Sequence, residues 1–148
     1  MSELTIRGVT GADFTDWQRL WRGYLEFYRA EVPADTMRLT WQRLLDAAEP
    51  VHGALAITES GPVGLVHYIE HRSCWTAEDS MYLQDLFVDP SVRGQGAGRA
   101  LIEHVYAESA ARGCSKVYWL THDTNETAMR LYDRIAERTG FVQYRKLI

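Results

Sequence analysis

Residues 88–99 read Val-Asp-Pro-Ser-Val-Arg-Gly-Gln-Gly-Ala-Gly-Arg, and this stretch predicts the fold of the chain more strongly than any other. A strand-like apolar segment leads into it, and a helix-forming segment leaves it. Glycine occupies three of its last six positions, so the backbone can turn sharply and expose successive N–H groups. A helix N-terminus adds unpaired donors and partial positive charge. The stretch therefore predicts a strand–turn–helix cradle for an anion, and phosphate suits it best.

Known phosphate-binding patterns narrow the choice of ligand. A dinucleotide-binding Gly-x-Gly-x-x-Gly would need glycine where this chain has Arg99 or Leu101. The P-loop pattern Gly-x-x-x-x-Gly-Lys-Ser/Thr does not occur in the sequence. Arg93 and Arg99 flank the glycines and can add charge-assisted contacts to a phosphate. The alternative is a glycine-rich turn that joins strand and helix without binding a ligand.

The periodicity of apolar residues predicts strands and helices on both sides of this turn. The early strands are joined by short turns and are expected to be antiparallel, whereas the later ones alternate with helices and are expected to pair through right-handed crossovers. The chain is therefore predicted to be an α/β protein with a mixed sheet of six to seven strands and helices on both faces. Strands are expected over 4–9, 52–59, 63–71, 81–89, 116–121 and 141–147, and helices over 14–31, 35–48, 99–112 and 125–138.

Length and composition bound the possible functions. The 148 residues suit a single domain spanning 1–148. The net charge of −4 argues against a nucleic-acid partner, and no apolar run is long enough to span a membrane. Residues 1–7 lack the pattern of a signal peptide, which favours a cytoplasmic protein. Cys74 and Cys114 lie far apart without metal-ligand spacing, so we expect two reduced thiols and no metal site.

Three motifs resemble a known superfamily. Arg93, Gly96 and Gly98 fit the pattern Arg/Gln-x-x-Gly-x-Gly/Ala, which is the pyrophosphate-binding signature of the GNAT N-acetyltransferases. Residues 125–132 match the Asn-x-x-Ala-x-x-Leu/Phe-Tyr pattern that follows it in the same superfamily, and Gly-Phe then opens the closing segment. The resemblance covers most of the chain and is most specific to the diamine and histone-polyamine acetyltransferases. It implies the GNAT acyl-CoA N-acyltransferase fold.

The resemblance also implies the reaction and its cosubstrate. Members transfer acetyl from acetyl-CoA to a primary amine by direct attack through a tetrahedral intermediate. The backbone of the glycine turn is implied to hold the pyrophosphate, and the edge of strand 86–88 to pair with the pantetheine arm. A bulge in that strand is implied to splay it from strand 116–121. The implied CoA-binding residues are Phe87, Val88, Arg93, Gly94, Gln95, Gly96, Ala97, Gly98, Arg99 and Asn125.

Proton transfer sets the catalytic requirements. A departing thiolate needs a proton, and the phenol of Tyr132 is the predicted catalytic donor. The developing oxyanion needs a donor, for which the backbone N–H of Phe87 or of Val88 is the candidate. An alkyl ammonium has a pKa of about 10.4, so only about one amine in a few thousand is a free nucleophile at pH 7. The site must therefore accept a proton from the amine.

The proton acceptor is left open by the sequence. The stretch 83–88 resembles the Leu-Glu-Asp strand of the subgroup, but Gln84 stands where a carboxylate is expected and an amide cannot take a proton. Asp85 is the catalytic candidate, pointing to the opposite face of the strand. The alternatives are His67, Glu70, His122 and a chain of water without a dedicated base.

The acceptor pocket is expected to lie beside the aromatic helix 14–31. Tyr24, Tyr28 and Glu31 can form an aromatic and acidic rim for an ammonium group, and Gln84 is placed with them as a substrate-binding residue. The alternative is that these aromatic residues only pack the helix on the sheet. The predicted acceptor is a small amine, a polyamine or a lysine side chain.

Two other functions compete with a small-amine acetyltransferase. One is a non-catalytic acyl-CoA-binding regulatory module, and the other is an N-acetyltransferase of proteins or peptides. The closing segment 141–147 can offer a sheet edge, which predicts a homodimer.

Overall fold

The computed structural model describes residues 3–148, so Met1 and Ser2 at the start of the predicted single domain lie outside the described residues. Short 3-10 turns at Gly11–Asp13 and Pro90–Val92 precede two of the helices. No helix in the described part is long and apolar enough to cross a membrane. The elements are β1 (Thr5–Gly8), α1 (Phe14–Phe27), α2 (Ala34–Leu45), β2 (Val51–Thr58), β3 (Gly61–His71), β4 (Ser80–Val88), α3 (Ala97–Ala111), β5 (Lys116–Tyr118) and α4 (Glu126–Ile135).

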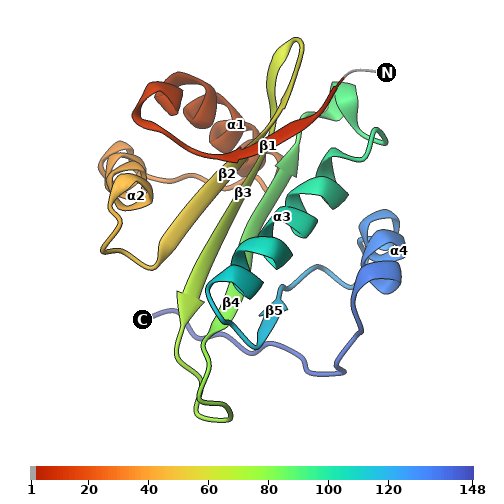
Figure 1. Cartoon of the computed structure of the whole chain (residues 1–148). Helices are drawn as coiled ribbons and strands as arrows, with labels where there is room; N and C mark the ends of the chain where they lie inside the picture. The colour runs from red at the N-terminus through yellow and green to blue at the C-terminus, as the bar shows by residue number, and fades with distance from the viewer. Residues whose placement is uncertain (1–2) are drawn as a thin grey trace.

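The described strands form a five-stranded sheet in the order β1-β2-β3-β4-β5. The pairs from β1 to β4 are antiparallel, and β4 pairs in parallel with β5 after the crossover through α3. Figure 1 shows α1 and α2 on one face of this sheet and α3 on the other. The predicted α/β class, the mixed sheet and the helices on both faces are confirmed.

The two faces of the sheet bury different side chains. The α3 face is aliphatic, apart from Tyr68, and it also receives the apolar side of α4. The α1 face is aromatic and holds the buried His67. Its core consists of Trp17, Leu20, Trp21, Met37, Leu55, Leu65 and Phe87.

A β-bulge in β4 decides which of its side chains reach which face. His67 of β3 pairs with Asp85 and the next residue of β3 pairs with Leu83, so Gln84 is the extra residue. Before the bulge Leu83 packs on the α3 face, and after it Phe87 packs on the α1 face. The bulge therefore turns Asp85 towards α1, where it meets His67.

The bulge coincides with the end of the pairing between β4 and β5. Only Ser80, Met81 and Tyr82 pair with β5, and the two chains then separate. The predicted splay is thus present, but the bulge lies at Gln84 rather than within residues 86–88. A gap in the sheet opens beside the second half of β4, and the candidate site lies there.

The predicted strand 116–121 ends at Tyr118, and two further sequence predictions are wrong. Residues 141–147 form no strand, because their side chains are largely exposed and the described chain offers them no paired neighbour. The sheet consequently has five strands instead of six or seven. The first helix ends at Phe27 instead of Glu31, because Arg29 adopts a left-handed φ of 52° and Ala30 N–H bonds back to Leu25. This hydrogen-bonded cap closes the helix well before Pro33.

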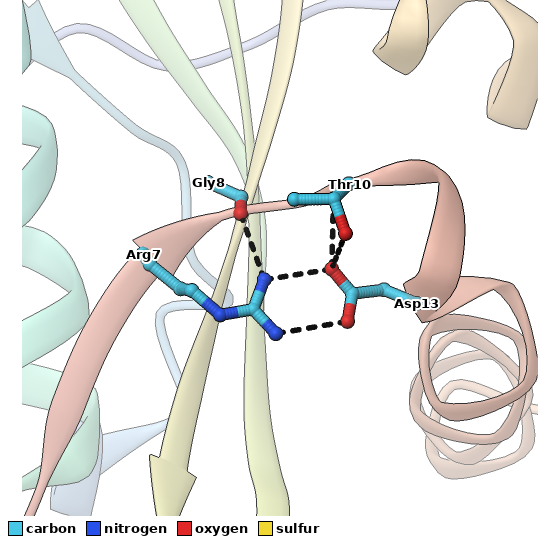
Figure 2. A network of polar contacts seen from close by, with 4 residues as sticks. All are labelled: Arg7, Gly8, Thr10 and Asp13. Carbon is cyan, nitrogen blue, oxygen red and sulfur yellow. Dashed lines mark hydrogen bonds and ion pairs between the residues drawn. The ribbon is translucent and has the colours of Figure 1, made fainter.

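A polar cluster fixes the start of α1 to the sheet (Figure 2). Arg7 of β1 makes two hydrogen bonds to the Asp13 carboxylate, at 2.7 and 2.9 Å, and a third to the carbonyl of Gly8. Thr10 N–H donates to the same carboxylate at 2.7 Å. The Arg7 guanidinium and these donors lower the pKa of Asp13 to about 2. The cluster thereby sets where α1 crosses the sheet.

Candidate active site

The glycine turn brings the end of β4 to the beginning of α3. Asp89 accepts hydrogen bonds from the backbone N–H and the hydroxyl of Ser91, which starts the turn. Gly94 and Gly96 then have φ values of 84° and 87°, a left-handed conformation that favours glycine. The helix begins at Ala97, two residues earlier than the sequence predicted.

The first turn of α3 presents unpaired backbone donors. The first helical hydrogen bond joins Ala100 N–H to the carbonyl of Gly96, so the N–H groups of Ala97, Gly98 and Arg99 have no partner within the helix. A Cβ built on Gly94 or Gly96 would meet no atom of the described chain within 4 Å, so the space before the turn is open. These residues fit a diphosphate group.

The flanking arginines are tied to other parts of the structure. Arg93 Nε donates to the carbonyl of Val88 at 3.2 Å, and its guanidinium lies 5.3 Å from the ring centre of Phe27. Arg99 Nε donates to Glu103 at 2.9 Å along the helix. Backbone amides therefore form the cradle, and the two arginines add positive charge at its sides.

Successive N–H groups of β4 point to opposite edges of the strand, so the two candidate oxyanion donors, Phe87 N–H and Val88 N–H, face different neighbours. Asp89 N–H bonds to Val63 of β3, so Phe87 N–H also points towards β3 and Val88 N–H points to the open edge. The contact of Arg93 with the carbonyl of Val88 agrees, because N–H and C=O of one residue share an edge. Phe87 instead buries its ring against Gly23 of α1. Val88 is the better-placed donor.

A small cavity occupies the gap between β4 and the chain after β5. Among the predicted site residues it brings together Tyr24 of α1, Tyr28 directly after this helix, the bulge residue Gln84 and Tyr132 of α4. Residues 119–121 form a wall in the segment from which β4 was predicted to splay, but none of the three was predicted as a site residue. The lining residues are Tyr24, Tyr28, Leu83, Gln84, Leu86, Ile102, Trp119, Leu120, Thr121 and Tyr132.

Tyr132 reaches this cavity from α4 and stays protonated at neutral pH. Its ring meets Trp119 edge-on, with ring centres 5.3 Å apart. Burial, followed by the neighbouring Tyr28, raises the pKa of the Tyr132 phenol above its ordinary value of 10. A protonated phenol beside the open edge of β4 can donate a proton, as the predicted role requires.

Asn125 and Glu31 lie at the margins of the arrangement. Asn125 precedes α4 and donates from its side chain to Thr121, which lines the cavity, at 3.3 Å. Glu31 lines a different hollow, between α1 and α2, together with Val32 and Met37. The structure therefore does not bring Glu31 together with Tyr24 and Tyr28.

The candidate proton acceptors also differ in position. Asp85 is 13% exposed at its side chain and lies 3.0 Å from His67, and its charge helps to raise the pKa of the phenol of the cavity residue Tyr24. Glu70 instead faces Arg112, 3.6 Å away, and His122 is exposed before α4. Among residues 3–148, no group of three or more His, Cys, Asp or Glu side chains is placed to hold a metal ion.

The gap beside β4, with an anion cradle at one end and a tyrosine-lined cavity along it, suits an enzyme that binds an acyl-CoA and transfers its acyl group. The chain belongs to the Acetyltransferase (GNAT) family, whose sequence pattern matches residues 17–136. It is thus an acetyl-CoA-dependent acetyltransferase, and the predicted resemblance is confirmed.

Relatives extend this assignment. The chain is 34% identical to the D-amino-acid N-acetyltransferase HPA3 of Saccharomyces cerevisiae over 97% of its own length and 90% of the relative. It is 36% identical to the thialysine N-epsilon-acetyltransferase of Sus scrofa, over 51% of this chain and 42% of that one. A bisubstrate complex of the aminoglycoside acetyltransferase AAC(6')-Iy shares the fold, with a TM-score of 0.84, 20% identity and coverage of 99% and 100%.

Proposed function

We propose that this enzyme acetylates a small primary amine inside the cavity between β4 and the chain after β5. The observation that carries the proposal is that Tyr24, Tyr28, Gln84 and Tyr132 line one cavity in this gap, beside the splayed half of β4. The second half of β4 leads directly into the glycine turn. The cavity is small and walled by aromatic rings, which favours a compact acceptor.

The cosubstrate end is built from backbone groups. The N–H groups of Ala97, Gly98 and Arg99 hold the diphosphate, and the open edge of β4 at Leu86 and Val88 binds the pantetheine amides. Asn125 orients the arm near Thr121. Acetyl-CoA, when bound there, supplies an acetyl group activated as a thioester.

The acceptor end is built from side chains. Tyr24 and Tyr28 receive the ammonium group against their rings, and the Gln84 amide oxygen accepts a hydrogen bond from the amine. Val88 N–H stabilises negative charge on the acetyl oxygen during attack. Tyr132 donates its proton to the departing sulfur.

The named relatives support an amine of metabolite size. HPA3 is named for D-amino acids and the partial match for thialysine, and both are free amino acids. Gln84 in place of a carboxylate removes one negative charge from the acceptor side, so an acceptor with a single cation suits it better than a polyamine with several.

The test is thiol release from acetyl-CoA with a panel of D- and L-amino acids, spermidine and a lysine-containing peptide. We expect turnover with free amines of amino-acid size and little with the peptide. Turnover with the peptide alone would defeat the small-amine assignment. Absence of calorimetric binding of both CoA and acetyl-CoA would defeat the whole proposal.

We also propose that two copies of the chain associate through residues 141–147. Phe141, Val142, Tyr144 and Leu147 are between 77% and 94% exposed, which is unusual for apolar side chains in one extended stretch. Light scattering should give a dimer mass for the wild type and a monomer mass for Phe141→Ser/Tyr144→Ser. A monomeric wild type at micromolar concentration would contradict this.

A further inference from the structure

A series of buried polar contacts joins α1, β3 and β4. Trp17 of α1 is fully buried, and its Nε1–H donates to His67 Nε2 at 3.0 Å. His67 of β3 is 3% exposed, and its Nδ1 lies 3.0 Å from the Asp85 carboxylate. An indole N–H can only donate, so Nε2 is the accepting nitrogen and the ring proton is on Nδ1. Trp17 therefore donates to His67, and His67 in turn donates to Asp85, so both hydrogen bonds run towards the Asp85 carboxylate.

Tyr24 links this series of contacts to the cavity. Burial, followed by the nearby Asp85 carboxylate, raises the pKa of the Tyr24 phenol, so its hydroxyl lies near Asp85, and its ring lines the cavity. The ring stacks on Trp21 with centres 5.1 Å apart and an interplanar angle of 14°, which fixes its orientation. Asp85 is not among the cavity-lining residues, so a group bound in the cavity reaches this carboxylate through the phenol.

The other titratable groups near Asp85 do not line the cavity beside it. Tyr82 faces the carboxylate from β4 and stacks on Tyr118 of β5. Tyr28 lines the cavity but interacts with Tyr24 rather than with the carboxylate. Tyr24 is therefore the phenol that joins the cavity to Asp85.

We propose that Tyr24 is a catalytic residue that passes the acceptor's proton to Asp85, and that His67 is a positioning residue that holds Asp85 for this transfer. The inference rests on the proposed function, because it assumes an amine acceptor in this cavity. The ammonium N–H bond breaks and its proton moves to the Tyr24 oxygen. In the same step the Tyr24 proton moves to Asp85, which becomes a neutral acid. The nitrogen keeps its electron pair for the attack.

The chemistry of the site explains why such a path is needed. The amide of Gln84 occupies the nearest position on β4 and cannot accept a proton. A phenol that donates a proton to a carboxylate keeps lone pairs on its oxygen, so it can receive one proton while it releases another. The fixed His67 proton keeps the Asp85 oxygens oriented, as a second partner does for many catalytic carboxylate and histidine groups.

The first experiment compares Tyr24→Phe with Tyr82→Phe, using the best amine of the panel between pH 6.5 and 10. Tyr82→Phe removes a hydroxyl near the same carboxylate but outside the cavity, and should keep kcat/KM within about 3-fold. Tyr24→Phe should lower kcat/KM by about 10–100-fold at pH 7. This deficit should shrink towards the wild-type value near pH 10, because the amine then arrives neutral. A deficit of equal size at every pH, or no deficit, would overturn the relay.

The second experiment isolates the positioning role. His67→Leu should show the same pH-dependent deficit as Tyr24→Phe, while His67→Gln should recover part of it, because a glutamine can both accept from Trp17 and donate to Asp85. Trp17→Phe, which keeps an aromatic ring but removes the N–H and part of the buried indole, covers the case in which a His67 variant does not fold. CoA affinity by calorimetry should stay unchanged in all folded variants. A His67→Gln variant no better than His67→Leu would refute the positioning role.

Nitrogen NMR of the wild type gives a readout that is independent of turnover. The His67 ring should carry its proton on Nδ1. A proton on Nε2 would refute the proposed direction of the hydrogen bonds from Trp17 through His67 to Asp85. If the wild type is active and Tyr24→Phe has the same kcat/KM, the proton relay is refuted but the proposed function is not. A wild type that neither binds CoA nor releases thiol from acetyl-CoA would refute the proposed function itself.

Discussion

The cosubstrate end and the acceptor end of the site are built on opposite principles. The cosubstrate end is mainly one contiguous stretch, Leu86 to Arg99, whose donors belong to the backbone, and the side chain of Asn125 is added to it. The acceptor end is assembled from side chains of α1, β3, β4 and α4, and two contacting members, Trp17 and His67, are 50 residues apart. The comparison teaches that the first end depends on chain conformation and tolerates many side chains, whereas the second depends on individual hydroxyl and imidazole groups.

The sharpest way to break the cosubstrate end is Gly96→Val. A side chain at φ 87° strains the turn and occupies the open space that the diphosphate needs, so we expect CoA binding to fall by more than 100-fold in calorimetry. Gly113→Val is the matched control, because Gly113 has a φ of 78° and open space at the other end of the same helix. It should lose stability but bind CoA normally. Normal CoA affinity in Gly96→Val would refute the backbone cradle.

At the acceptor end we expect the loss of one hydroxyl group, that of Tyr132, to lower activity strongly. Tyr132→Phe is expected to lower kcat by 10–1000-fold while CoA affinity changes less than about 2-fold, because the ring still packs and only the proton donor is lost. Tyr106→Phe is the control, since its hydroxyl donates to the Ile135 carbonyl at the end of α4 and Tyr106 does not line the cavity. That variant should cost about 1 kcal/mol of stability and keep kcat. An unchanged kcat in Tyr132→Phe would remove the acid assignment.

Asp13→Asn tests whether the base of α1 affects only the acceptor end. The pKa of Asp13 is lowered from 3.8 to about 2, so its stabilising effect is present above pH 4 and is lost as the pH falls through about 2. We expect the variant to be less stable by about 1–2 kcal/mol in denaturant unfolding at pH 7, with the difference from wild type closing near pH 2.

Asp16→Asn provides the comparison for that measurement. Asp16 forms an exposed pair with Arg19 at 3.4 Å, and its loss should cost less than about 0.5 kcal/mol at any pH. CoA affinity of the folded fraction should be unchanged in both variants. A difference between Asp13→Asn and wild type that persists at pH 2 would contradict the assignment of the lowered pKa to this cluster.

The sequence predicted the cosubstrate end well because its determinants are local. Two glycines before the helix and one in its first turn specify a turn and a set of free amides without reference to the rest of the chain, and Gly113 ends α3 as expected. The α/β class and the order of elements followed from periodicity in the same way. The cytoplasmic location and the single domain stay predictions.

The acceptor end was predicted less completely because its determinants are tertiary. Tyr132, Tyr24, Tyr28 and Gln84 were named, but the contact between Trp17 and His67 depends on how α1 crosses the sheet and has no local signal. The early end of α1 was missed because Arg29, not a glycine, adopts the left-handed conformation. Residues 141–147 alternate like a strand, but alternation cannot show whether a paired neighbour exists.

Because Gln84 is an extra residue, odd-numbered side chains of β4 face α3 before it and α1 after it. This reversal limits how the enzyme can be engineered. Deleting one residue there would rotate the second half of the strand by one side chain, sending Phe87 into the aliphatic layer under α3 and Leu86 towards the aromatic layer under α1. A designer who wants a new acceptor can therefore exchange side chains around the bulge freely, but should keep the length of this strand constant.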